Sequence, residues 1–552
     1  MDKNLLTLWQ SVPSGGVKQE EIAELLELSP RQTSRSLKKW QEQGWFDYSS
    51  GRGRGKASNL KWLRNVEEEF ECQLMKWIDK DAVEKSSKYL LYDWSEHSKE
   101  RLMDKFRSKF GYIQSPDKQD KLIIPRKYPL LTIHPLETAE VQGAHIVTNV
   151  FNRLVAVDSN GIVSPELAHS WDAEPDKVRL YLKKGVKFHD GSMLTAQDVV
   201  KCLEKIRKHV HFKNLWEPVT EIYSPAPLVV DILFPGGCSY CLQMLGMMNA
   251  SIYKEPNGQL VGTGSFFVEA ISKSKATLQA FKDHFRERPL LDVVEFVVVP
   301  ADFDFTYRSA AEEKTQETVQ VESDSGFGIV IMNAFRDSDI RQKDVRDFIH
   351  HIISKHRHGI ERVDERISPN HKSCLAGQDQ HYLPPEIRRP NFKKPLVLKT
   401  TSYVANTTAW LQSILEKEGV PIEIMELPFE EYTFNKMKNR QADLFIHGEI
   451  FEMNQNFSFY QFLVYGYSPL ASIVQSDASF SRLTSNYKHT PFERWITLNL
   501  AVERALLESS ILVPLYYVKR QIPFSINLLN IKISHFGYVD FAKLWLRPQI
   551  KK

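Results

Sequence analysis

The feature that most constrains this chain is a helical pattern near its start that runs into a basic, glycine-rich segment. Apolar residues recur at helical spacing between Leu5 and Trp40, and the run Gly51-Arg52-Gly53-Arg54-Gly55-Lys56 follows. Two alternating segments, 45–48 and 60–63, flank the basic run and predict a hairpin with a basic tip. A helix-turn-helix followed by such a hairpin indicates a winged DNA-binding domain.

The third helix of this unit has a well-marked predicted start at Ser29-Pro30. Serine caps a helix amino terminus, and proline suits the first helical position because no backbone donor is required there. In a helix-turn-helix the amino-terminal residues of this helix meet base edges in the major groove. The residues predicted to contact DNA from this helix are Arg31, Gln32, Thr33, Ser34, Arg35 and Lys38.

Local charge supports this interpretation. Residues 29–64 contain nine basic residues against two acidic ones, whereas the whole chain of 552 residues has a net charge of +3. Such a basic region is the electrostatic footprint of a nucleic-acid binder, and the implied partner is double-stranded DNA. At the hairpin tip we expect Arg52 and Arg54 to enter the minor groove and Lys56 to hold a phosphate.

The N-terminal region has two other interpretations, a protein-interaction domain and a nucleotide-binding P-loop. A three-helix unit with a few arginines can also be a protein-interaction domain. A nucleotide-binding P-loop is disfavoured by the spacing, because Ser50 stands where the first glycine is required and Ala57 where a magnesium-binding hydroxyl is needed.

Composition describes the rest of the chain in broad terms. A hydrophobic content of 42% with 26% charged residues is typical of a globular protein, and the length favours about three units. Met1-Asp2-Lys3-Asn4 lacks the pattern of a secretory signal, and no run of 18 apolar residues occurs. The five cysteines do not form a disulfide framework. We therefore expect a cytoplasmic protein with no membrane partner.

Beyond residue 121, short apolar strands alternate with amphipathic helices, which indicates α/β architecture. The polar segment Ser115–Lys121 is the predicted linker, and the charged helical pattern before it is compatible with a bridge or a homodimer contact. The predicted domains are a winged helix-turn-helix (1–65), a helical bridge (66–115) and a sensor domain (116–552), the last divided into lobe I (about 120–300 plus 508–552) and lobe II (about 301–507).

Several runs of the large region resemble the family 5 extracellular solute-binding proteins of peptide and nickel transporters. These runs are Val150–Val155, Leu167–Trp171, Leu182–Gly191, Leu194–Val200, Gly262–Phe266, Leu291–Val294, Gln441–Phe445 and Val513–Tyr516. The resemblance spans about residues 120–552. It implies a two-lobed α/β fold of the type II periplasmic-binding-protein class.

With Leu8-Trp9-Gln10, Gly44-Trp45, Gly53–Lys56 and Gly537–Phe541 included, the whole arrangement resembles the SgrR family of bacterial transcriptional regulators. The resemblance implies a cytoplasmic regulator that closes two lobes around a small molecule and so alters DNA binding or transcription. The effector classes considered are a peptide, a sugar, a sugar phosphate or a chelate. The alternatives are a receptor that delivers solute to an ABC permease, and a regulator whose binding domain serves only protein interaction.

Two departures from the transporter-linked relatives indicate candidate ligand contacts. Ile133-His134-Pro135 stands where those relatives carry Leu-Asp-Pro, and Gly448-Glu449 stands where they often carry Gly-Trp. His134 and Glu449 are therefore the predicted ligand-binding residues. Cys238-Ser239-Tyr240-Cys241 has the spacing of half a zinc site, but no second such pair follows. No nucleophile–base motif emerges, so we predict no catalytic residue, metal or cofactor.

Overall fold

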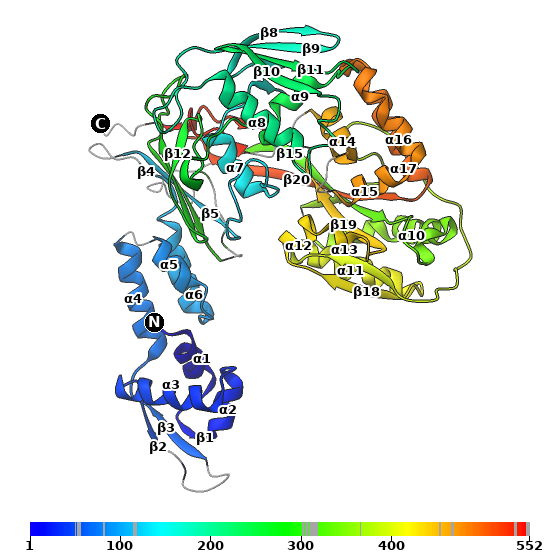
Figure 1. Cartoon of the computed structure of the whole chain (residues 1–552). Coiled ribbons are helices and arrows are strands. Elements are labelled where there is room, and N and C mark those ends of the chain that lie inside the picture. The colour runs from blue at the N-terminus through cyan, green and yellow to red at the C-terminus, as the bar shows by residue number, and fades with distance from the viewer. Residues whose placement is uncertain are drawn as a thin grey trace.

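The computed structural model defines a winged unit, a helical bridge and two α/β lobes (Figure 1). It describes the chain except for residues 50, 52–56, 81–82, 114–118, 301–302, 304–306, 308–317, 365, 452–453, 465–467, 535–537 and 548–552. Among the described helices, none has the length and apolar character needed to cross a membrane.

The N-terminal unit is a winged helix-turn-helix. Its elements are α1 (Lys3–Ser11), β1 (Gly15–Val17), α2 (Gln19–Leu25), α3 (Pro30–Glu42), β2 (Phe46–Ser49) and β3 (Ser58–Trp62). Helix α3 starts where predicted, because the Ser29 hydroxyl accepts the backbone N–H of Gln32 and the Gln32 side chain accepts the backbone N–H of Ser29. The sequence pattern does not predict β1, which pairs with β3 and makes the sheet three-stranded in the order β1-β3-β2.

The bridge consists of α4 (Val66–Asp79), α5 (Val83–Leu90) and α6 (Glu96–Arg107). Its apolar side chains share one buried cluster with the winged unit on one side and with the sheet of lobe I on the other. At the lobe I end, the ring of Phe303 lies 5.9 Å from that of Phe106 and 4.9 Å from that of Phe110. The Ser87 hydroxyl also donates to the carbonyl of Val298. The winged unit is thus joined to lobe I by a continuous core.

The predicted linker is wrong as a domain boundary. Strand β4 (Gly111–Ile113) pairs antiparallel with β5 (Lys121–Arg126), so the polar segment connects two neighbouring strands of one sheet. A polar, proline-containing stretch is as typical of a hairpin connection as of a linker, which explains the error. The end of the bridge is therefore part of the lobe I sheet.

Lobe I contains two sheets. The five-stranded sheet has the order β12-β13-β14-β5-β4, with β14 parallel to β5, and the four-stranded sheet has the order β10-β11-β9-β8. The further strands are β8 (Ala168–Glu174), β9 (Lys177–Leu182), β10 (Glu221–Ala226), β11 (Val229–Leu233), β12 (Phe266–Ile271), β13 (Lys275–Ala280) and β14 (Val293–Val298). Helices α7 (Val141–Val150) and α8 (Ala196–Lys208) pack on this lobe.

Lobe II is built on a six-stranded sheet of order β16-β20-β15-β19-β17-β18. Its strands are β15 (Thr318–Met332), β16 (Ile367–Pro369), β17 (Leu396–Thr400), β18 (Ile422–Glu426), β19 (Leu444–Glu449) and β20 (Leu512–Ser525). Helices α10 (Lys343–His356) and α11 (Ala405–Lys417) bury their apolar faces in the core of this sheet. Strands β17, β18 and β19 run parallel, and this direction sets the edge at which a ligand can bind.

The predicted lobe limits differ from the structure at the C-terminal side. Strand β20 pairs with β15 along its length and the two strands run between the lobes, so the chain returns to lobe I along β20 and not at 508. The remaining helices of this region are α14 (Gln455–Val464), α15 (Pro469–Ser476), α16 (Ala478–Ser485) and α17 (Trp495–Glu508), and α17 contacts both lobes. The ring of Trp495 packs 5.4 Å from that of Tyr240, and the Ser373 hydroxyl donates to Glu503 at 2.6 Å.

We predict that Phe106→Ala destabilises the bridge and its contact with lobe I. Phe106 is fully buried, so its truncation leaves a cavity and should cost about 3–5 kcal/mol. Urea unfolding followed by tryptophan fluorescence measures the effect. Leu91→Ala is the matched control in the same bridge, because Leu91 is 52% exposed. Equal midpoints for the two variants would contradict the continuous core.

Candidate functional site

The exposed face of α3 carries the basic residues expected to meet DNA. Arg31, Arg35 and Lys38 are exposed, and their spacing of four and three residues places them on one side of the helix. Among the described residues, Lys38 makes a long ion pair with Glu42, at 3.9 Å. These three side chains are therefore available to an external partner.

Three other predicted DNA contacts are engaged within the protein. Gln32 accepts the backbone N–H of Ser29 at 3.1 Å, and Ser34 donates to the carbonyl of Pro30 at 3.1 Å. Thr33 is fully buried and donates to the carbonyl of Ser29 at 3.1 Å. The assignment of Thr33 to base contact is therefore wrong, because helical periodicity turns this residue into the core.

The other three basic residues predicted to contact DNA belong to the tip of the wing. These residues, Arg52, Arg54 and Lys56, lie outside the described residues. The strands that lead to the tip, β2 and β3, are paired antiparallel from Phe46 with Trp62 to Ser49 with Asn59. The predicted hairpin is thus confirmed as a hairpin, while the roles of its three basic residues stay predictions.

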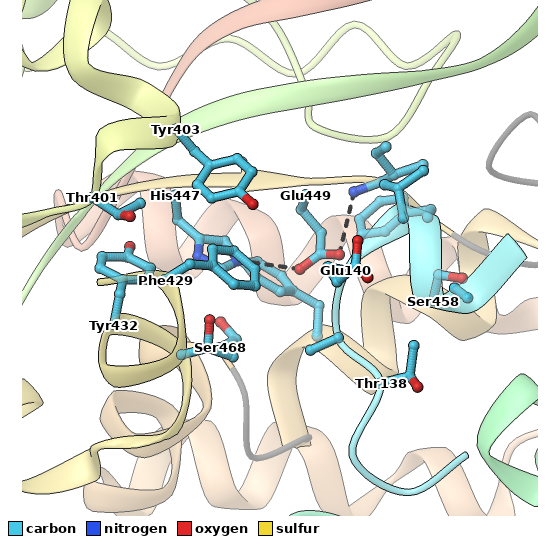
Figure 2. Close-up of a pocket in the computed structure, with 18 of the residues that line it drawn as sticks. Thr138, Glu140, Thr401, Tyr403, Phe429, Tyr432, His447, Glu449, Ser458 and Ser468 are labelled. Carbon is cyan, nitrogen blue, oxygen red and sulfur yellow. Dashed lines mark hydrogen bonds and ion pairs between the residues drawn. The ribbon is translucent and has the colours of Figure 1, made fainter. Parts of the chain in front are cut away.

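A cavity of about 320 Å³ lies between the two lobes (Figure 2). Its lobe I wall is formed by residues 138–141, Ala144 and residues 248–249. The wall of lobe II and its helices contributes Thr401, Tyr403, Val404, Phe429, Tyr432, Thr433, residues 446–451, Ser458, Gln461, Phe462 and Ser468.

The lobe II wall lies at the carboxyl ends of its parallel strands. Thr401 and Tyr403 follow β17, Phe429 follows β18 at the start of α12 (Phe429–Phe434), and Glu449 ends β19. Ligands of open α/β sheets bind outside this edge. The cavity therefore occupies the position at which a ligand of such a fold is expected.

Glu140 brings a partly buried carboxylate to the lobe I wall. It caps α7, where its side chain accepts the backbone N–H groups of Gln142 at 2.9 Å and of Gly143 at 2.7 Å. Position 143 requires glycine, since a Cβ there would lie 2.6 Å from the carbonyl oxygen of Thr132. Burial raises the pKa of Glu140 above its ordinary value. No sequence motif distinguishes Glu140, so its place in the wall was not predictable from the sequence.

Glu449 lies on the opposite wall, as Figure 2 shows. His447 Nε2 lies 3.1 Å from Glu449 Oε2, and the backbone N–H of Ile450 donates to Glu449 Oε1 at 3.2 Å. The His447 ring also stacks on Phe462 at 5.7 Å. The structure thus places the predicted residue Glu449 in the wall of the cavity, held by neighbours that fix its direction.

His134 does not line the cavity. Its Nδ1 accepts the backbone N–H of Leu136 at 3.2 Å, and its Nε2 lies 3.4 Å from Glu255 Oε1. Its ring packs against Tyr253 at 5.2 Å. The structure therefore does not place His134 in the wall of this cavity but beside residues 253–255, and its role as a ligand contact stays a prediction.

Aromatic rings connect the two walls near the cavity. The ring of Tyr403 lies 4.5 Å from that of Tyr128 in lobe I and 4.8 Å from that of Phe429 in lobe II. Burial raises the pKa of Tyr403 to about 12. This row of three rings bridges the lobes, so their relative position affects the cavity directly.

A second cavity, of about 520 Å³, lies entirely on lobe I and the C-terminal segment. Its lining includes Arg153, Glu166, Arg286 and Lys543, and Arg153 is already paired with Glu166 at 3.2 Å. None of its lining residues comes from lobe II. Lobe closure would leave it unchanged, and the cleft between the lobes is therefore the candidate effector site.

Comparison with known protein families separates the chain into two matching parts. Residues 4–112 match the family described as "Sugar transport-related sRNA regulator N-term". Residues 163–316 match the family described as "Bacterial extracellular solute-binding proteins, family 5 Middle".

Known proteins resemble the chain over most of its length. The HTH-type transcriptional regulator SgrR of Photorhabdus laumondii is 23% identical, and the match covers 99% of each chain. Among solved structures, the peptide-bound periplasmic binding protein DppA of Helicobacter pylori has a TM-score of 0.64 at 17% identity, covering 79% of this chain and 98% of its own. The oligopeptide-binding protein AppA of Bacillus subtilis has a TM-score of 0.62 at 16% identity, covering 79% and 100%.

These findings define the class of the protein as a helix-turn-helix transcriptional regulator with a two-lobed, solute-binding-protein-like domain. Within that class, the chain is similar to the SgrR regulators: residues 4–112 match the SgrR N-terminal family, and a similarity to SgrR at 23% identity extends over 99% of the chain. The fold and the resemblance expected from the sequence are confirmed.

We predict that Arg31→Ala and Arg35→Ala each reduce discrimination between specific and random DNA by about tenfold or more, because a bidentate contact to a base contributes roughly 1–3 kcal/mol. Lys38→Ala should weaken binding to all sequences and lower the salt dependence. Fluorescence anisotropy at several salt concentrations distinguishes these outcomes. Lys76→Ala, an exposed charge on α4, is the control. Unchanged binding in all three variants would remove α3 from the DNA interface.

Proposed function

We propose that the chain is a cytoplasmic regulator that binds an operator through α3 and the wing, and that a small molecule in the cleft controls this activity. The effector closes lobe II onto lobe I, and closure changes DNA binding or transcription. Arg31, Arg35 and Lys38 are the proposed contacts on α3, with Arg52, Arg54 and Lys56 on the wing. The proposed role is one of binding, without a catalytic step.

The observation that carries this proposal is the asymmetric attachment of the winged unit. The winged unit shares its core with the bridge and with the lobe I residues Ile123, Val297, Val299 and Phe303. The cleft, in contrast, has one wall from lobe I and the other from lobe II and its helices. A ligand that draws the lobes together therefore moves lobe II relative to the whole DNA-binding arm.

The bridge offers polar as well as apolar contacts for this coupling. The Ser274 hydroxyl of lobe I donates to Glu84 of α5, and Ser87 of α5 donates to the carbonyl of Val298. Both lobe I partners lie on or beside β13 and β14. Because these contacts fix α5 on the sheet, a strain in lobe I reaches the bridge without an intervening flexible joint.

We predict that an effector stabilises the full chain and changes its DNA affinity. A ligand present at 100 times its dissociation constant adds about 2.7 kcal/mol to stability, which a thermal melt detects. A panel of peptides, sugars, sugar phosphates and chelates is screened first, and each stabilising compound is then added to an anisotropy titration with DNA. Linkage requires that DNA change the affinity for the compound by the same factor.

Phe303→Ala tests the route of coupling. It should leave ligand binding in place and reduce the ligand-dependent change in DNA affinity, because Phe303 joins lobe I to Phe106 and Phe110. Leu290→Ala, at a 54% exposed position of the same lobe, is the control. A full response in Phe303→Ala would show that the signal does not pass through this contact. A chain that binds DNA with no ligand response would point instead to a protein partner.

A further inference from the structure

We infer that the effector is a small molecule with a positively charged nitrogen, an ammonium or guanidinium group, and not a phosphate or carboxylate anion. This inference rests on the proposed function, since it names the ligand class for the same cleft. It follows from the charge of the two walls, from the capped amino terminus of α7 on the lobe I wall, and from the aromatic rings that line the cavity.

The charged side chains of the cavity wall are acidic. Glu140 and Glu449 contribute a carboxylate from each lobe, and no residue among those described in the wall is lysine or arginine. His447 is already held against Glu449 at 3.1 Å. An anion in this cavity would be buried against carboxylates without a basic partner, whereas a cation would find one carboxylate on each wall.

The amino terminus of α7, the helix on the lobe I wall, is not available to an anion. Free backbone N–H groups at the start of a helix form a natural site for phosphate or carboxylate. In α7 these donors are taken by the protein itself, because Glu140 accepts the N–H groups of Gln142 and Gly143. The position that a phosphate would occupy thus already holds a carboxylate of the chain.

The remaining wall suits the body of a small organic cation. Tyr403, Phe429, Phe451 and Phe462 line the cavity, and ring faces attract cations as well as apolar groups. The cavity of about 320 Å³ lies at the lower end of the range for small-molecule sites, roughly 300–1,000 Å³. A compound of the size of an amino sugar or a dipeptide is therefore appropriate, with its charged nitrogen between Glu140 and Glu449.

One basic residue, Arg126, lies near the lobe I wall of the cleft. Arg126 acts electrostatically on Glu140, but it is only 3% exposed and does not line the cavity. Its Nη2 group donates to the carbonyl of Lys273 at 3.3 Å. Its Nε and Nη1 groups have no hydrogen-bond partner among the described residues. Because Arg126 is the basic residue that acts on Glu140, a variant of Arg126 tests whether an anion uses it.

The experiment compares matched ligands that differ in charge. Three sets are titrated into the full chain by calorimetry and thermal melt: glucosamine, glucose and glucose 6-phosphate; phenethylamine, 2-phenylethanol and phenylacetate; and Ala-Leu amide, N-acetyl-Ala-Leu amide and N-acetyl-Ala-Leu. We expect the cationic member of at least one set to bind, and to bind tighter than its neutral and anionic counterparts by about tenfold or more.

Variants then locate the charge preference. Glu449→Gln keeps the shape of the side chain and should weaken the cationic ligand by about tenfold, since it removes one charged acceptor. Glu140→Gln should do the same, with some loss of stability from the weaker cap of α7. Glu430→Gln is the matched control, because it removes one exposed negative charge from α12 outside the cavity wall. Arg126→Met should leave the cation affinity unchanged or increase it.

The inference is overturned if an anionic member binds tightest, if no cationic member binds, or if neither glutamate variant weakens the cation. Loss of anion binding in Arg126→Met would then identify Arg126 as the anion partner. DNA titrations on the same preparations distinguish a failure of the proposed ligand class from a failure of the proposed ligand-controlled DNA binding. If an anion binds and alters the affinity for DNA, the proposed cationic ligand class is wrong but the proposed ligand-controlled regulator is supported. If a cation binds without altering the affinity for DNA, the ligand class is supported but the proposed ligand control of DNA binding is wrong.

Discussion

The apolar core that runs from the winged unit through the bridge onto the lobe I sheet determines how the rest of the molecule can work. Leu37 and Trp40 of α3, Leu74 of α4, Phe106 of α6 and Val297 of β14 belong to this one buried cluster. Packed interiors resist sliding and transmit displacement, so α3 keeps a fixed direction relative to lobe I. In the proposed mechanism lobe II is therefore the body that moves, and a ligand in the cleft acts by changing the position of lobe II relative to the winged unit, the bridge and lobe I.

The two long strands β15 and β20 connect lobe II to lobe I. They pair from Ile331 with Leu512 in the lobe II sheet to Thr318 with Ser525, and Figure 1 shows them running between the lobes. After β20 the chain returns to α7, where the backbone N–H of Val539 donates to His145 Nε2 at 3.0 Å and Phe541 stacks on the His145 ring at 4.8 Å. The strand pair that carries lobe II thus leads directly to the segment that holds α7.

The sequence predicted well those features that depend on local chemistry. The Ser29-Pro30 cap, the α3 helix and the basic-tipped hairpin follow from residue type and spacing, and the long solute-binding runs indicate the two-lobed fold. Features that depend on distant contacts were not predictable. The predicted linker is a connection between two paired strands, because β4 pairs with β5. His134 lies outside the cavity wall because its side chain contacts Glu255 and Tyr253. Glu140 carries no motif at all, since its importance arises from what α7 faces.

The carboxylate of Glu140 both caps the amino terminus of α7 and lines the cavity. Its ionised form caps α7, and burial opposes that form by raising its pKa. A cation in the cleft favours the ionised carboxylate, so its binding strengthens the cap, whereas an anion would favour the protonated group and weaken it. In the proposed mechanism the charge of the ligand would act on the cap of α7, which the C-terminal segment packs against through His145 and Asn149. The proposed ligand class and the proposed response of lobe I would then depend on the same carboxylate.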